Sequence, residues 1–497
     1  MAFVTHEHWA DPASPETSQA GAASESPERA DLVDALAPLG VSFGYWNTEG
    51  RWVDTPTETL RAAFADFCRR PWPHAGAGPL VCTPGRYHPQ LFGTLILQSG
   101  SHVRASGTVN EPGYHILYTD AGVRRFVIAA PERFRTPARG WGWQVQLYAA
   151  RSQASWGIGD FRDLALICRL AREQGASCVQ VSPVHAAAPV THPQDSPYSP
   201  ASRLFLNLLH IAPAAAPGAE LVDLSDLAER GRALNRRRLI DRTAVWAIKQ
   251  AALERIWAVV RTDPGLQFDR YVEQRGRALQ TFATWCAIVE RQPSSDWRRW
   301  PEGLRRPSSA AARAFAETHA DRVRFYAWCQ WVADFQYAQA CRQGVDVVAD
   351  VAVGFDATSA DAWALQDLLS FAFEIGAPPD KHNTEGQRWG LPPFDPQALT
   401  QADFAPFIDM VRSSLRHAGA LRIDHVMQLW RLYWIPVDAD AADGVYVYYP
   451  VDALLAILRL EAARANAWIV GEDMGTVASG VRETMDAIGM LGNRSAM

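Results

Sequence analysis

The chain has 497 residues, of which 48% are hydrophobic and 21% are charged, a balance typical of a globular protein. At roughly 150 residues per domain, this length predicts several folding units rather than a single core. Lysine and arginine together number 48 and aspartate and glutamate 54, which gives a net charge of −6. This balance argues against nucleic acid or an anionic membrane as the main partner and favours a neutral substrate.

The cysteines and the apolar segments exclude further classes of protein. The 7 cysteines form no CxxC pair and have no histidines at metal-ligand spacing, so we expect neither structural disulfides nor a bound metal. No glycine-rich phosphate loop is present, and we expect no cofactor. The N-terminal sequence lacks the basic segment and apolar core of a signal peptide, and no run of about 18 apolar residues occurs. These features predict a cytoplasmic protein.

The first part of the chain changes character twice. Residues 1–29 predict a disordered tail, because the segment is rich in Ala, Ser, Glu and Pro and has little to bury. Residues 30–137 predict a small β-rich domain. It begins with a helix at "TPTETLRAAFADF", where Thr55 and Glu58 match a capping box. The segments "LFGTLIL", "HVRASGTV", "YHILYTDAG" and "RRFVIAA" then predict short strands.

Residues 138–497 alternate between apolar strands and amphipathic helices. The string "GIGDFRDL" predicts a turn in front of a helix, and strands follow in "SCVQVSPV", "VDVVADVAVG", "ALRIDHV" and "AWIVGED". Unusual polar residues come directly after these strands, where a β/α barrel places its chemistry. A helical insertion at about 223–345 interrupts the series. Its apolar stripe from Val245 through Ile248, Ala252 and Ile256 to Val259 indicates helix packing.

Two carboxylates emerge from apolar runs, Asp424 in "LRIDHVMQLW" and Glu472 in "WIVGEDMGTV". Moving a carboxylate out of water costs on the order of several kcal/mol unless a partner or a reaction site compensates. The period of two along a strand puts Arg422 beside Asp424, and a guanidinium favours the ionised carboxylate that a nucleophile needs. The apolar run before Glu472 would desolvate that acid and favour the protonated form that a proton donor needs.

Each of these two strings also has a structural interpretation. Arg422 and Asp424 are equally compatible with an ion pair inside a barrel that has no catalytic role. A Glu-Asp pair after a strand is often a solvated turn. Neither string decides the function by itself.

Four longer strings together carry a family resemblance. They are "DSPYSPASRLFLN" at 195–207, "GAPPDKHNTEGQRWGLPPFDP" at 376–396, "LRIDHV" at 421–426 and "GEDMGTV" at 471–477. In this order and spacing they resemble the amylomaltases, the 4-α-glucanotransferase (disproportionating enzyme) family of α-amylase-type barrels. The likeness runs from about Gly140 to near Gly492, and the β-rich front resembles the extra N-terminal domain of longer bacterial members. The resemblance implies an α/β fold of the (β/α)8 (TIM) barrel type with a helical insertion.

The resemblance also implies roles for individual residues. Asp424 would be the nucleophile, Glu472 the general acid and base, and Arg422 the residue that orients the nucleophile, in a retaining transfer of α-1,4-glucan segments between maltodextrins. The implied substrate-binding residues are Tyr198, Asp350, Asp380, Gln387, Trp389 and His425. Two of these have structural alternatives: Asp350 as a hydrogen-bonded acid at a strand end, and His425 as a core histidine.

The chain departs from the family pattern in two places. Lys381 and His382 stand where family members often have an aromatic residue, so the loop that covers the sugar is expected to hold it differently. The sequence ends at "GMLGNRSAM" without the family's Thr-His-Asp string, which carries a third catalytic acid. We therefore expect a barrel that is incomplete at the C-terminus and a chain that is inactive or nearly so. An α-glucan hydrolase and a non-catalytic glycan-binding remnant are the alternative functions.

Overall fold

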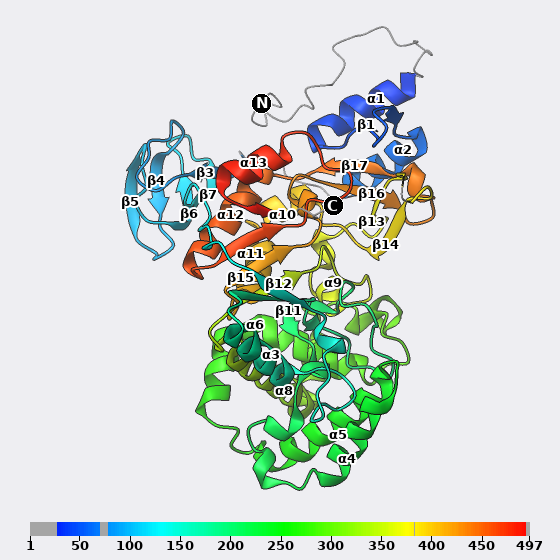
Figure 1. Ribbon diagram of the computed structural model, residues 1–497. Coiled ribbons are helices and arrows are strands. Elements are labelled where there is room, and N and C mark those ends of the chain that lie inside the picture. Colours follow the sequence, from blue (N-terminus) through cyan, green and yellow to red (C-terminus); the bar gives the residue numbers. More distant parts are fainter. Residues whose placement is uncertain (1–26, 70–77, 382, 494–497) are drawn as a thin grey trace. The chain divides into compact units, whose positions relative to one another are not determined.

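The computed structural model of the chain describes residues 27–69, 78–381 and 383–493. Most of the predicted tail, together with His382 and the last residues of the "NRSAM" ending, lies outside the described residues. The chain forms two compact units (Figure 1). Unit 1 comprises residues 1–136, 367–411 and 423–497, and unit 2 comprises residues 137–366 and 412–422. The domain boundaries predicted from the sequence stay a prediction.

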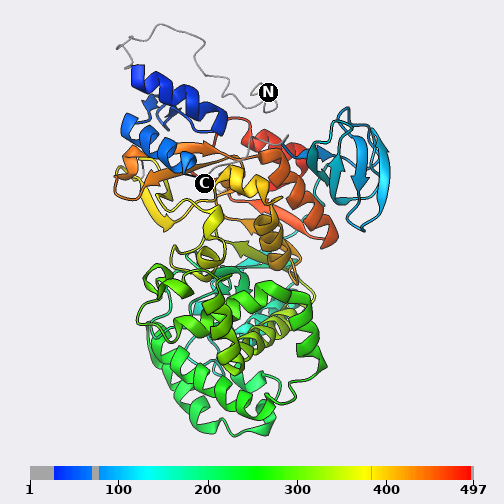
Figure 2. The ribbon, with the colours of Figure 1, turned by 180° about the vertical axis from the view of Figure 1, so that it is seen from behind.

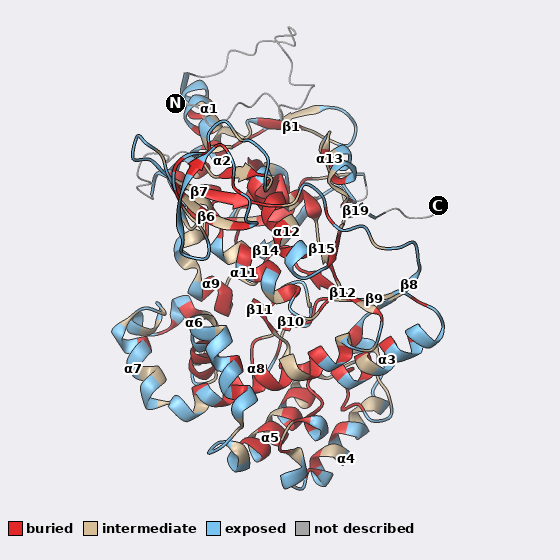
Figure 3. Cartoon of the chain, turned by 90° about the vertical axis from the view of Figure 1, so that its left-hand side faces the viewer, coloured by how far each residue is buried: buried red, intermediate tan, exposed pale blue. Residues whose placement is uncertain are grey.

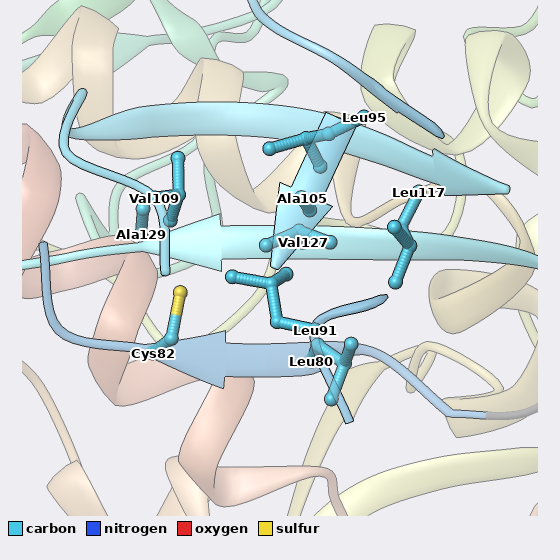
Figure 4. Close-up of a cluster of buried hydrophobic side chains, with 9 residues drawn as sticks. All are labelled: Leu80, Cys82, Leu91, Leu95, Ala105, Val109, Leu117, Val127 and Ala129. Carbon is cyan, nitrogen blue, oxygen red and sulfur yellow. The ribbon is translucent and has the colours of Figure 1, made fainter. Parts of the chain in front are cut away.

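Unit 1 contains a five-stranded sheet near its N-terminus. Its strands lie in the order β3 (Leu80–Cys82), β7 (Arg124–Ala129), β6 (Gly113–Tyr118), β4 (Phe92–Ile96) and β5 (His102–Ser106). Neighbours are antiparallel except β3 and β7. Successive side chains of a strand point to opposite faces of the sheet, and those on one face form a buried cluster that includes Leu95, Leu117 and Val127 (Figure 4). Each of the four segments predicted as a strand from its β-branched and aromatic residues contains all or most of one, so these predictions are confirmed.

A second, antiparallel sheet in unit 1 has the order β14 (Gln387–Leu391), β13 (Phe373–Ala377), β16 (Arg431–Pro436) and β17 (Val445–Tyr448). The hairpin of β1 (Gly44–Trp46) and β2 (Trp52–Asp54) packs on it, with the Tyr45 ring edge-on to Tyr433 and Tyr446. The helices that precede and follow the hairpin are α1 (Pro27–Leu36) and α2 (Thr57–Cys68). Helix α1 thus begins inside the predicted tail.

The capping box predicted at Thr55 is wrong. Helix α2 has Pro56 at its N-cap position, with no side-chain cap hydrogen bond. Thr55 is buried, and its hydroxyl donates to the Ser42 carbonyl oxygen at 3.4 Å. The hydroxyl therefore joins two segments of the chain outside the helix, which starts at Thr57.

The last part of unit 1 is built around α12 (Val451–Arg464), which is buried along most of its length. Figures 1 and 2 show α12 beside the five-stranded sheet, where it contacts β3 and β7. The hydroxyl of Tyr114 on β6 donates to the Glu461 carboxylate of α12 at 2.7 Å. The remaining elements of this part are α10 (Pro396–Gln401), α13 (Val481–Ile488) and the parallel pair β18 (Trp468–Gly471) and β19 (Leu491–Gly492).

Unit 2 contains the parallel strands β8 (Gly142–Val145), β9 (Cys178–Val181) and β12 (Asp346–Val351), with β9 in the middle. Helix α3 (Phe161–Glu173) connects β8 to β9 and begins at a capping box made by Asp160 and Asp163, which confirms the predicted turn before a helix. The short antiparallel strands β10 (His185–Ala186) and β11 (Ser202–Leu206) follow. Helix α11 (Ala405–Ser414) and strand β15 (Ala420–Ile423) each include residues of both units.

The region between β11 and β12 is helical, as predicted. Its helices are α4 (Ser225–Ala233), α5 (Arg242–Val260), α6 (Leu266–Val289), α7 (Ala310–Thr318) and α8 (Ala320–Cys341), and the shorter α9 (Ala360–Ala364) follows β12. Figure 3 shows α8 as largely buried, whereas α4 and α7 have broad exposed faces. The predicted α5 stripe is buried from Val245 to Ile256, but Val259 is 49% exposed because it lies in the last turn, beyond the packed face. That part of the prediction is wrong.

Candidate active site

Asp424 and Glu472 both belong to unit 1, and each directly follows the last residue of a short strand, β15 and β18 respectively. Two main-chain hydrogen bonds join the strand ends: the Glu472 N–H donates to the Ile423 carbonyl oxygen, and the Val426 N–H donates to the Glu472 carbonyl oxygen, each at 2.9 Å. Gly471 permits this approach, because a Cβ at that position would lie 2.6 Å from Cγ2 of Val426. The structure therefore brings the segments that carry the two acids together.

The Glu472 side chain is half-buried and accepts two main-chain hydrogen bonds. The His425 N–H donates to Oε2 at 3.0 Å, and the Met474 N–H donates to Oε1 at 2.9 Å. The sequence indicated only the apolar run before this glutamate and therefore only desolvation. The two amides are functional groups that sequence reasoning missed, because a main-chain donor leaves no signature in residue type.

His425 adopts a left-handed conformation directly after Asp424, with φ 46° and ψ 68°. Its ring packs edge-on against Trp389, with 5.3 Å between the ring centroids. Burial lowers the pKa of His425 to about 4, and the positive charge of Arg431 acts in the same direction, so the ring is neutral at pH 7. The main-chain carbonyl of Asp424 accepts a hydrogen bond from the side-chain amide Nε2 of Gln428 at 2.6 Å.

Three further predicted residues lie on or just before β14 in unit 1. The indole N–H of Trp389 donates to Oε1 of Gln387 at 3.1 Å; Gln387 is exposed and Trp389 half-buried. In the preceding loop, the Asp380 carboxylate accepts the Asn383 N–H at 2.7 Å. Trp389 therefore shares a site with His425 and, through the His425 amide, with Glu472.

In unit 2, Asp350 joins the remaining two predicted residues. This acid is only 4% exposed at the end of β12. Its Oδ1 accepts from Arg422 Nη1 at 2.7 Å, and its Oδ2 accepts from the Tyr198 hydroxyl at 2.9 Å. Both carboxylate oxygens are thus engaged, as the interpretation of a hydrogen-bonded acid at a strand end describes. Strand β15 ends at Ile423, so the period-two argument that paired Arg422 with Asp424 does not extend to Asp424.

Among residues 27–69, 78–381 and 383–493, no three His, Cys, Asp or Glu side chains are grouped as a metal ion would require. In the same part of the chain, no helix combines the length and the apolar character of a membrane span.

Comparison with known proteins identifies the family. The family model described as 4-alpha-glucanotransferase, glycoside hydrolase family 77, matches residues 145–496. The chain belongs to this family. It is 42% identical over 412 residues to a 4-alpha-glucanotransferase of Mycobacterium tuberculosis, covering 76% of this chain and 56% of the relative. It is 35% identical over 391 residues to the Haemophilus influenzae 4-alpha-glucanotransferase, covering 72% of this chain and 56% of the relative. This 4-alpha-glucanotransferase family member thus spans about half the length of these relatives.

Solved structures share the fold of this chain. The amylomaltase from Corynebacterium glutamicum superposes with a TM-score of 0.80 at 27% identity, covering 93% of this chain and 75% of that structure. An amylomaltase from Streptococcus agalactiae in complex with acarbose gives a TM-score of 0.63 at 18% identity, covering 71% and 72%. The fold is therefore of the α/β barrel type.

Proposed function

We propose that this chain carries catalytic machinery of a 4-α-glucanotransferase, which moves α-1,4-glucan segments between maltodextrins by retaining double displacement. The observation that carries the proposal is the joining of the Asp424 and Glu472 segments by the main-chain hydrogen bonds from Glu472 to Ile423 and from Val426 to Glu472. A retaining mechanism needs two carboxylates on neighbouring supports, roughly 5 Å apart. Membership of the family supports the choice of reaction.

In the proposed mechanism, Asp424 attacks the anomeric carbon of the donor glucan, and Glu472 protonates the departing glycosidic oxygen. The bond between the sugar and Asp424 then holds the glycosyl group on the protein. In the second step Glu472, now ionised, takes the proton from an acceptor hydroxyl, which attacks the same carbon and releases Asp424. The two amides on Glu472 suit this second state, because hydrogen bonds from N–H groups favour a charged carboxylate.

The substrate-binding roles are part of the same proposal. Trp389 and Tyr198 offer flat rings to pyranose faces, and the amide of Gln387, the carboxylate of Asp380 and the His425 ring offer polar groups to sugar hydroxyls. Asp350 would act through its two partners, because it holds Arg422 and the Tyr198 hydroxyl. Arg422 would in turn orient Asp424. The scaffold for these residues would be a (β/α)8-type barrel with a helical insertion, in a cytoplasmic protein whose partners are α-1,4-glucans rather than nucleic acid or membranes.

Incubation of the purified chain with maltotriose tests the proposal. Transfer predicts glucose and longer maltodextrins with a constant number of reducing ends, and Asp424→Asn or Glu472→Gln should abolish both products. Glu483→Gln, an exposed acid on α13, is the matched control and should behave like the wild type. A rise in total reducing ends would instead indicate the hydrolase. A glucan-induced increase in melting temperature without any products would indicate the binding remnant.

A further inference from the structure

His425 contacts two proposed functional residues through different parts of itself. Its ring lies edge-on to Trp389, with an interplanar angle of 81°, and its N–H donates to the Glu472 carboxylate at 3.0 Å. The ring and the amide are joined by a single backbone position, so a change in the backbone at His425 alters both contacts.

That backbone position is in a sparsely populated conformation. A non-glycine residue with positive φ is uncommon, although histidine tolerates the left-handed region better than most side chains do. Such a conformation persists where surrounding contacts hold it, and it is concentrated at functional sites. At His425 the edge-on Trp389 ring is a contact that can hold it.

The left-handed turn also explains where two successive amides point. The His425 N–H meets the side chain of Glu472, and the next N–H, that of Val426, meets the main-chain carbonyl of the same residue at 2.9 Å. Of these two amides, the His425 N–H reaches the carboxylate, and the Met474 N–H donates to the other carboxylate oxygen at 2.9 Å.

We propose that His425 is a positioning residue: its ring, seated on Trp389, holds the left-handed turn, and the turn aims the His425 amide at the Glu472 carboxylate. Strand β14, which carries Trp389, is thereby coupled to the orientation of Glu472. This role differs from direct sugar binding by the imidazole, because it depends on the backbone rather than on the ring nitrogens. The importance of Glu472 rests on the proposed function, whereas the coupling itself rests only on the geometry.

Substitutions at His425 separate the two roles. Glycine adopts the left-handed conformation without help and has no ring, asparagine adopts it readily, and a β-branched valine resists it. The measurement is the carbodiimide labelling of Glu472 in the full 497-residue chain, resolved by peptide mass spectrometry over a range of pH. Only the protonated carboxyl reacts, so the pH midpoint of labelling reports how well the charged form is stabilised. Glu483 in the same digest is the internal control.

We expect His425→Val to move the Glu472 labelling midpoint upward by about one pH unit, because one charge-stabilising amide is lost. His425→Gly and His425→Asn should stay near the wild-type midpoint, and Glu483 should not change in any variant. An unchanged midpoint in His425→Val, or an equal shift in His425→Gly, would overturn the proposal. If the valine variant folds poorly, the comparison of Trp389→Leu in the wild-type and His425→Gly backgrounds decides.

Trp389→Leu tests the coupling directly. It should raise the Glu472 labelling midpoint when His425 is present and leave it unchanged in a His425→Gly background, since glycine needs no ring contact to hold the turn. Equal shifts in both backgrounds would refute the coupling. Failure of the maltotriose assay would contradict the proposed function without affecting these labelling results, whereas intact transfer with no labelling shift would contradict only this inference.

Discussion

His210 is predicted to make unit 2 sensitive to acid. Its side chain is 3% exposed, and Nδ1 donates to the Gly159 carbonyl oxygen at 2.8 Å. Burial lowers the pKa of His210 from 6.5 to about 4, and the charge of Lys249 contributes in the same direction. Between pH 6.5 and about pH 4, His210 is therefore mostly protonated in the unfolded chain and mostly neutral in the folded chain. The stability contributed by the neutral ring is complete above pH 6.5 and is lost as the pH falls toward 4.

The magnitude follows from the two pKa values. At pH 5, about 1.5 pH units below the unfolded pKa and still above the folded one, protonation of the unfolded state costs the folded state about 2 kcal/mol. His210→Asn removes the titration and keeps an N–H donor close to the position of Nδ1. Between pH 7.5 and pH 5 the wild type should therefore lose about 2 kcal/mol more of its free energy of unfolding than the variant does.

Urea denaturation at several pH values measures this difference. Hydrogen exchange of peptides from α8 identifies the unfolding transition of unit 2. Helix α8 is suitable because its Tyr337 ring contacts the Phe161 ring, which in turn contacts the His210 ring. His102→Asn, at an exposed histidine of β5, is the control and should follow the wild-type pH dependence. If the His210 variant and the wild type lose stability in parallel, the argument from the buried neutral ring is wrong.

Two further predictions concern the candidate site. Asp350→Asn should lower the unfolding free energy of unit 2 by about 3 kcal/mol or more, because Arg422 loses a buried ionic partner. Tyr198→Phe removes one hydrogen bond and should cost only about 1 kcal/mol. Similar losses in the thermal melts of the two variants would contradict this ranking. Gly471→Ala should destabilise unit 1 by about 1–3 kcal/mol through the clash with Val426, and adding Val426→Ala should restore part of the loss. A double variant no more stable than Gly471→Ala would show that the clash is not the cause.

Local patterning predicted the elements whose causes are local. The turn and helix at "GIGDFRDL" form because Asp160 and Asp163 cap α3 within a few residues of each other. The β-branched and aromatic content of short segments likewise predicted strands of the five-stranded sheet, one face of which is buried in a common cluster. Thr55 had an equally good local pattern, but Ser42 is its partner, and a contact between distant segments cannot be read from spacing.

The candidate site shows the same division between local and non-local causes. The strings predicted that Asp424 and Glu472 follow buried strands, and the structure places both there. The Arg422–Asp350 ion pair joins residues far apart in sequence, so a strand-period argument could not find it. The left-handed backbone at His425 could not be predicted from the sequence either, because the conformation of a single histidine depends on the contacts around it.

The Tyr114–Glu461 hydrogen bond has a practical consequence for dissecting the protein. Helix α12 is buried partly by β3 and β7, yet these strands precede residue 145, where the family match begins. A shortened protein that starts at the matched segment would uncover a leucine-rich helix surface and strip the 4%-exposed Glu461 of its tyrosine. Low solubility of such a shortened protein would then result from the exposed helix surface, so the five-stranded sheet should be retained in any expression experiment.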